Sequence, residues 1–135
     1  MGRSRGGFST KVHLTTDGLG YPLRIRLTAG QRHDILQAHE LIVGLPFAFV
    51  IADRSYNAAE FRDEIIAAGA EPVIPPNRKA KAPHDYDAWR YRERHLIECF
   101  IGKIKHFRRV FSRFDKLARR YLGFLHFVSA LIWLR

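Results

Sequence analysis

The chain has 135 residues, a length that suits one domain with a hydrophobic core. Apolar residues make up 47% and aromatic residues 13%, more than a disordered chain carries, so the sequence predicts a folded protein. The formal net charge of +10 favours a polyanionic partner or an anionic membrane surface. The single cysteine, Cys99, cannot form an internal disulfide, and no apolar run of signal-peptide length follows the basic N-terminus, so we expect a cytoplasmic protein.

The first half of the chain alternates between strand and helix patterns. Residues Phe8–Thr16 and Tyr21–Thr28 alternate along their length on either side of a glycine-containing turn, and so predict a β-hairpin whose second strand buries Leu23, Ile25 and Leu27 on one face. A helix is expected over Ile35–Val43, with Asp34 as its cap. The apolar run Phe47–Ala52 predicts a strand buried on both faces.

The second half adds another strand and three helical patterns. A helix is expected over Asn57–Ala68 and a short edge strand over Glu71–Pro75, so the order of elements predicts a mixed α/β sheet. After a basic loop, one long helical pattern begins near Asp87 and a last one covers Lys116–Leu134. The apolar part of the last pattern is too short to cross a bilayer, and it predicts a core helix.

Almost all of the positive charge lies in this basic loop and the helix after it. Between Arg78 and Arg120 there are 14 Lys and Arg residues and 5 Asp and Glu residues, a net charge of +9. Solvated helix faces normally mix the two signs, so the excess predicts contact with nucleic acid. Most aromatic residues in this segment have the spacing of core residues, whereas Tyr91 and Trp89 are better placed to meet a sugar or a base.

Two carboxylates of the chain are candidates for a functional role. Asp53 follows the apolar strand, where a sheet presents functional side chains, although a cap or turn role fits its position equally well. At about 100° per residue, Glu98 shares one helical face with three polar residues: Tyr91, Arg94 and Lys105. A carboxylate in this setting can hold a divalent cation while its neighbours bind phosphates. An ion pair between Arg94 and Glu98 is the alternative.

The residues on this face resemble the signature of a known family. Tyr91, Arg94, Glu98 and Lys105 have the Y-x2-R-x3-E-x6-K spacing of insertion-sequence DDE transposases. The chain is similar to the IS-five-like group in further segments, which are Gly2–His13, Leu27–Asp34, Ala52–Tyr56, Val73–Pro76 and Ala130–Arg135. The resemblance covers essentially the whole chain, and it implies that residues 1–135 are the C-terminal half of a catalytic domain, with the basic loop and signature helix within 78–120.

The resemblance implies a ribonuclease H-like fold, a mixed sheet flanked by helices. In such a site three acidic residues bind two Mg²⁺ ions, which Mn²⁺ can replace, and drive strand cleavage and strand transfer at transposon ends. Asp53 matches the second acid and Glu98 the third. The two ions would activate the attacking water or 3′-hydroxyl and stabilise the leaving oxygen. Tyr91, Arg94 and Lys105 match the positions that handle the DNA backbone.

Other basic residues are expected to contact DNA as well. They are Arg108 and Arg109 after the signature, and Arg3, Arg5 and Lys11 in the N-terminal segment. The expected partners are the double-stranded DNA of transposon ends and targets, and further copies of the chain in an active homo-oligomer. Such a protein would be associated with the nucleoid and not with a membrane.

The first acid of the triad has no counterpart in the chain. In the family, this Asp lies on a strand upstream of the segment that begins here at Gly2, and DNA-binding helices also lie upstream. Asp17 fits the hairpin turn and Asp34 the start of a helix, so both are poor substitutes. We therefore expect little activity from the chain alone, and a chain from an upstream reading frame is a candidate partner.

Two other functions fit the same residues. The chain could be a non-catalytic DNA-binding fragment that competes with or inhibits an intact transposase, which would need the basic helix but not Glu98. A basic amphipathic module for membrane surfaces is the third hypothesis, and it is disfavoured because the C-terminal apolar run is needed for the core.

Overall fold

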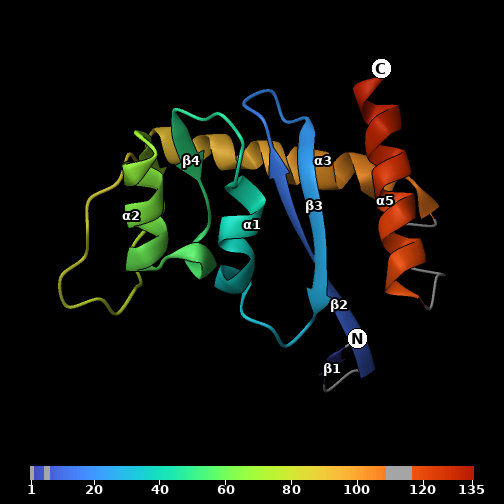
Figure 1. Ribbon diagram of the computed structural model, residues 1–135, viewed down its shortest axis with the longest axis horizontal. Helices are drawn as coiled ribbons and strands as arrows, with labels where there is room; N and C mark the ends of the chain where they lie inside the picture. Colours follow the sequence, from blue (N-terminus) through green and yellow to red (C-terminus); the bar gives the residue numbers. More distant parts are fainter. Residues whose placement is uncertain (1, 5–6, 109–116) are drawn as a thin grey trace. The chain divides into compact units, whose positions relative to one another are not determined.

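The computed structural model describes residues 2–4, 7–108 and 117–135 (Figure 1). The chain forms two compact units, each described by itself below. The hairpin unit consists of Met1–Arg32 together with His95–Arg135, and the middle unit consists of His33–Arg94. Each unit has its own hydrophobic core, so each set of buried residues can be assigned to one unit.

The hairpin unit contains the predicted β-hairpin. Strands β2 (Gly7–Thr16) and β3 (Pro22–Ala29) pair antiparallel, and β1 (Gly2–Ser4), which the sequence did not predict, pairs antiparallel with β2. The turn between β2 and β3 depends on Asp17, whose Oδ1 accepts hydrogen bonds from the backbone N–H groups of Leu19 (2.9 Å) and Tyr21 (2.8 Å). The predicted turn role of Asp17 is thereby confirmed.

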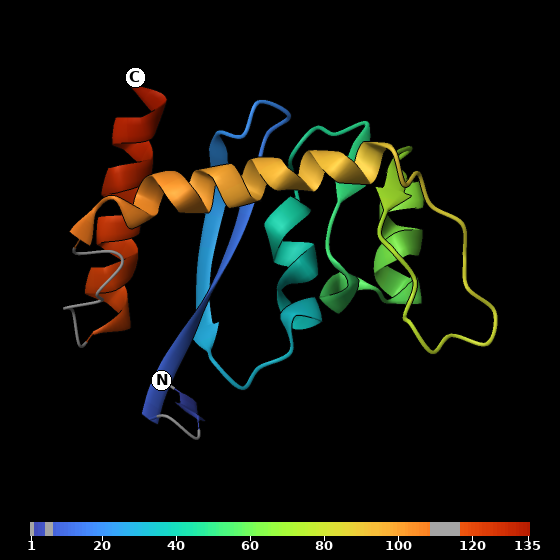
Figure 2. The same cartoon turned by 180° about the vertical axis from the view of Figure 1, so that it is seen from behind.

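Two helices cover this hairpin. In Figures 1 and 2, α3 (His95–Lys105) crosses the hairpin and α5 (Ala118–Trp133) lies beside β3. Their apolar faces meet Ile25 of β3 in one core, whose members on the helices are Phe100, Ile104, Tyr121, Leu125, Val128 and Ile132. Complete burial of a side chain such as Leu125 stabilises the fold by roughly 1.5–3 kcal/mol. The predicted core role of the last helix is confirmed.

One predicted core residue of the hairpin is exposed. Ile25 is buried and Leu27 is packed against the core, but Leu23 is 44% exposed. The pairing of β2 with β3 is irregular between Thr15 and Thr16, opposite this end of β3. A β-bulge or similar irregularity interrupts the strict alternation of faces on which the prediction depended.

The middle unit is built around a strand–helix–strand segment. Strands β4 (Phe49–Ile51) and β5 (Glu71–Val73) pair in parallel, and α2 (Ala59–Ala67) is the crossover helix that such a pair requires. Its other elements are η1 (Asp34–Gln37), α1 (Ala38–Ile42), η2 (Arg54–Tyr56) and η3 (Arg90–Arg94). Helices α1 and α2 share a core with the end of the β5 segment, made of Ala38, Ile42, Phe61, Ile65 and Ile74.

Two predictions for this unit are wrong in detail. Asp34 does not cap the first helix, because it is the first residue of the 3₁₀-helix η1, and neither η1 nor α1 has a side-chain cap. The strand β4 is not buried on both faces, since Phe49 is 38% exposed and Val50 and Ile51 are only partly buried. Among the described strands, β4 pairs only with β5, which leaves part of its surface uncovered.

The described strands thus form a three-stranded antiparallel sheet and a two-stranded parallel sheet, with helices in both units. This confirms a mixed α/β fold class. None of the helices that the described residues form is long and apolar enough to cross a membrane.

Candidate active site

Asp53 lies two residues after the end of the parallel strand β4, close to where the sequence places it. The backbone N–H of Ala52 still bonds to the carbonyl of Val73 at 3.3 Å, so pairing with the β5 segment continues up to the residue before Asp53. The Oδ1 atom of Asp53 accepts hydrogen bonds from the Ser55 backbone N–H at 2.8 Å and from the Ser55 hydroxyl, and so caps η2. Among the described residues, none bonds to Oδ2, which leaves this oxygen available to a ligand.

The loops that follow β4 and β5 are tied together beside Asp53. The Arg54 side chain donates from Nε to the carbonyl of Pro76 at 2.8 Å, and the His84 ring bonds to the carbonyl of Ile74 at 2.8 Å. The carboxyl ends of parallel strands are where open α/β sheets bind ligands. The Arg54 contact joins the two loops, and the His84 contact lies within the segment after β5. Both hold the backbone at that edge of the sheet in place.

Tyr56 belongs to the same region, although sequence reasoning did not select it as a site residue. Burial raises the pKa of the Tyr56 hydroxyl well above its usual range, and the carboxylates of Asp34 and Asp53 raise it further. The phenol therefore stays neutral and keeps its proton at physiological pH. Its place three residues after Asp53, inside a segment of the family resemblance, was the available signal.

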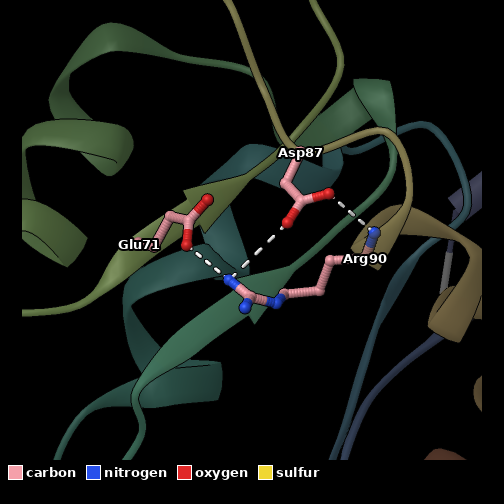
Figure 3. Close-up of polar contacts among 3 residues, drawn as sticks. All are labelled: Glu71, Asp87 and Arg90. Atoms are coloured by element: carbon pink, nitrogen blue, oxygen red, sulfur yellow. Dashed lines mark hydrogen bonds and ion pairs between the residues drawn. The ribbon is translucent and has the colours of Figure 1, made fainter.

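The start of the signature helix is fixed to the parallel sheet through Arg90 (Figure 3). Its Nη1 atom lies 2.5 Å from Oε2 of Glu71 on β5 and 3.8 Å from Oδ2 of Asp87. The Arg90 guanidinium also lies over the ring of Phe49 on β4, 4.7 Å from the ring centroid. Asp87 caps this helical segment, because its Oδ1 accepts from the Arg90 backbone N–H at 2.8 Å. The predicted helix start near Asp87 is confirmed.

The structure brings two signature residues, Tyr91 and Arg94, into contact. Both lie on η3, where residues three apart are on the same side of a 3₁₀-helix. The guanidinium of Arg94 is 5.9 Å from the centroid of the Tyr91 ring, and the ring of Tyr86 meets Tyr91 edge-on at 5.7 Å. A cation held against an aromatic ring is suited to contact a phosphate backbone.

The other two signature residues, Glu98 and Lys105, lie on α3 in the hairpin unit. They are seven residues apart, which is close to two helical turns, so they share one face, and both are exposed. The boundary between the units falls between Arg94 and His95, so the structure supports the two halves of the predicted face separately.

The donor atoms are suited to a divalent cation, although no complete site is formed within the described part of the chain. Within the described residues, no three or more His, Cys, Asp or Glu side chains form a group that could hold a metal ion. Asp53 and Glu98 each offer carboxylate oxygens, the ligand type that Mg²⁺ and Mn²⁺ prefer. The metal role of both residues stays a prediction.

The remaining predicted DNA contacts are dispersed. Arg108 is exposed just after α3, and Lys11 on β2 donates from Nζ to the carbonyl of Arg32 at 3.0 Å. Arg5 and Arg109 lie outside the described residues, as does the side chain of Arg3.

Comparison with known proteins identifies the family. The family model described as the transposase DDE domain matches residues 2–133. The chain is 41% identical over 132 residues to a Brucella ovis protein assigned as the transposase for insertion sequence element IS6501, covering 94% of this chain and 99% of the relative. It is 31% identical over 142 residues to a Burkholderia cepacia protein assigned to element IS402, covering 96% of this chain and 64% of the relative. No solved structure matches. Because the family model matches residues 2–133 of its 135 residues, the chain belongs to the DDE transposase family.

Proposed function

We propose that this chain is part of a transposase catalytic domain that cleaves and transfers DNA strands at the ends of an insertion sequence. The observation that carries the proposal is Asp53, which follows a parallel strand and keeps one carboxylate oxygen available. Its position supports a ribonuclease H-like fold, in which further strands would extend the small sheets seen here. DNA binding and transposition follow from the family.

In this proposal Asp53 and Glu98 hold divalent cations, either Mg²⁺ or Mn²⁺. When bound by these two carboxylates, such ions would supply Lewis-acid activation of the attacking oxygen and charge stabilisation of the leaving oxygen. The cap on Oδ1 keeps the Asp53 side chain in one orientation, so its other oxygen is presented to a ligand without a further loss of side-chain freedom. Glu98 is on a helix whose opposite face is buried in the hairpin core, which gives this carboxylate a rigid support.

The signature cations position the DNA strand in this mechanism. Arg94 offers a planar fork that fits a phosphate with two parallel hydrogen bonds, and Lys105 adds a point charge on the face that carries Glu98. Tyr91 lies against Arg94 and limits the rotamers that its guanidinium can adopt. Further contacts are proposed from Arg108, Arg109, Arg3, Arg5 and Lys11.

The proposal needs a third carboxylate that no residue of the chain matches. We propose that residues upstream of this segment or a second chain supply it, in a nucleoid-associated oligomer. The 135 residues alone should therefore bind DNA but cleave it poorly.

The test is Mn²⁺-dependent nicking of a duplex that carries the element's own terminal repeat. The protein is compared as the 135-residue chain and as a form extended by the coding sequence found upstream of Met1. We expect nicking by the extended form, and a loss of at least about 100-fold in Asp53→Asn and in Glu98→Gln, as expected for removal of a metal ligand from the reacting site.

Matched acidic residues serve as controls. Asp63→Asn and Glu93→Gln each remove one exposed carboxylate near the corresponding site residue in sequence, and they should nick as the unmodified protein does. Nicking that survives both site substitutions would contradict the assignment of Asp53 and Glu98. Tight DNA binding without any nicking by the extended form would instead favour a non-catalytic DNA-binding protein.

A further inference from the structure

The hairpin unit contains a cavity that the proposed catalytic chemistry does not use. It has a volume of about 520 Å³ and is lined by Tyr21, Lys103, His106, Phe107, Ile132 and Arg135. Tyr21 precedes β3, and the other residues come from the ends of α3 and α5 and the residues that follow them, all in one unit. The volume lies within the range of roughly 300–1,000 Å³ that ligand pockets occupy.

This cavity is on a different side of α3 from the signature face. At about 100° per residue, Lys105 is only about 20° from Glu98 around the helix, whereas Lys103 is about 140° away. A ligand in the cavity would therefore contact Lys103 without approaching the carboxylate of Glu98. The cavity is a candidate second site on the same helix.

The lining combines positive charge with aromatic surface. Lys103 and Arg135 are exposed cations and His106 adds a ring nitrogen, while no carboxylate side chain is among the described residues that line the cavity. The aromatic part is held in place, because Tyr21 stacks on Trp133 at 4.7 Å between centroids and the indole Nε1 of Trp133 donates to the carbonyl of Pro22 at 2.8 Å. Phe107 packs against the same core.

We propose that this cavity binds one unstacked nucleotide of a DNA strand. Lys103 and Arg135 would bind its phosphate, and the base would lie against Tyr21 and Phe107, as in other sites that hold single-stranded nucleic acid on aromatic surfaces. A free anion would use the cations but leave the aromatic lining without a partner. A nucleotide satisfies both parts. The inference rests on the proposed function, because it assumes that DNA is the polyanion that the family binds.

The test compares the affinity of the full chain for three DNA probes by fluorescence anisotropy, in EDTA so that no cleavage occurs. The probes are a blunt duplex, the same duplex with a short single-stranded extension, and the extended duplex with abasic sites in the extension. We expect the extended duplex to bind at least about tenfold more tightly than the blunt one, since each base stacked on an aromatic ring contributes measurably. The abasic extension should lose most of that preference.

Variants locate the effect in the cavity. Lys103→Ala and Arg135→Ala alter exposed side chains and should fold normally, and together they should reduce the preference to less than about threefold while changing the blunt-duplex affinity little. Arg32→Ala removes one exposed charge from the same unit outside the cavity, and it should keep the full preference.

The outcomes separate this inference from the proposed function. Binding to all three probes with equal affinity, or an unchanged preference in the Lys103→Ala/Arg135→Ala variant, overturns the nucleotide site and leaves DNA binding standing. An abasic extension that binds as tightly as the intact one overturns the role of the base. Failure to bind any of the probes at low salt contradicts both proposals.

Discussion

Asp53 shows how one carboxylate can have a structural and a functional role at once. Its Oδ1 atom holds the η2 turn through Ser55, and its Oδ2 atom lies outside that interaction. A turn role and a metal role, which were alternatives for the sequence, are therefore compatible in the structure. The two roles can be separated by substitution. An amide oxygen can accept the same hydrogen bonds in the turn, but it is a much weaker cation ligand than a carboxylate oxygen.

We expect the free energy of unfolding of Asp53→Asn to stay close to that of the wild type, and that of Asp53→Ala to be lower. Asn can still accept from the Ser55 backbone N–H, whereas Ala removes the cap, a change that typically costs about 0.5–2 kcal/mol. Urea denaturation followed by circular dichroism measures the difference in the free energy of unfolding. Equal stability of the two variants would show that the contact with Ser55 contributes nothing.

Tyr56 gives the molecule a pH dependence at high pH. Its pKa in the folded protein is raised above the ordinary value of 10.0, chiefly by burial and further by Asp34 and Asp53. Above pH 10 the unfolded chain loses this proton while the folded chain keeps it, so the unfolded state binds fewer protons. Stability should therefore be fully present below about pH 10 and fall as the pH rises further.

Replacing Tyr56 by Phe should flatten this dependence. The free energy of unfolding is measured for both proteins at pH 7, 9 and 10.5, and the difference between them is followed with pH, so that contributions from the other tyrosines cancel. We expect the free energy of unfolding of the wild type to fall relative to that of Tyr56→Phe as the pH rises past 10. A difference that stays constant over this range would contradict a buried neutral phenol.

At the scale of elements, the Arg90 contact fixes the start of the signature helix to the β4–β5 sheet. One guanidinium reaches Glu71 on β5, Asp87 at the helix start and the ring of Phe49 on β4. The side chains of Arg90 and Glu71 are 33% and 49% exposed, so solvent screens the ion pair and its contribution to stability is small. Its main effect is to set where Tyr91 and Arg94 lie relative to the strand that leads to Asp53.

A double-mutant cycle measures this contact directly. With Arg90→Ala, Glu71→Ala and the double variant, we expect a coupling free energy of about 0.5–1 kcal/mol in urea denaturation. Arg90→Lys should recover only part of it, because an ammonium is a more strongly hydrated point charge than the guanidinium, whose Nη1 atom meets both carboxylates. A coupling free energy of zero would mean that the pairing between the helix start and β5 does not contribute to stability.

The elements that local pattern specifies were predicted well, and those that depend on distant partners were not. Alternation around the Asp17 turn predicted the hairpin, and apolar spacing predicted the C-terminal helix. The exposure of Leu23 depends on the irregular pairing of its own strand with β2, and the exposure of Phe49 depends on how few strands cover β4. Neither is visible in a short window of sequence.

The candidate site divides in the same way. Asp53 was predicted as a site residue from its place after an apolar strand, and Glu98 was predicted from the spacing of the signature. Tyr56 and Arg90 were missed as site residues because their importance comes from groups that folding brings near them, such as Asp34 beside Tyr56 and Glu71 beside Arg90. Pairing of β4 with β5 creates that environment, and no single motif encodes it.

For the whole molecule, the signature spans the boundary between two units. Tyr91 and Arg94 fold with Asp53 in the middle unit, whereas Glu98 and Lys105 fold with the hairpin core. Each unit has its own core. The proposed function assigns a divalent cation to Asp53 and Glu98, and binding of that cation can be measured without DNA and without cleavage.

We expect Mn²⁺ to stabilise the chain against thermal unfolding in a way that requires both carboxylates. A ligand that binds only the folded state at 100 times its dissociation constant stabilises that state by about 2.7 kcal/mol, which for a chain of this size is a shift of several degrees in the midpoint. Asp53→Asn and Glu98→Gln should each remove most of the shift, and the double variant should remove no more than either one, because a shared ion needs both ligands. Asp63→Asn and Glu93→Gln, which remove exposed carboxylates elsewhere, should retain it. Additive losses in the double variant would mean that Asp53 and Glu98 bind separate ions, and an unchanged shift in either single variant would remove that residue from the site.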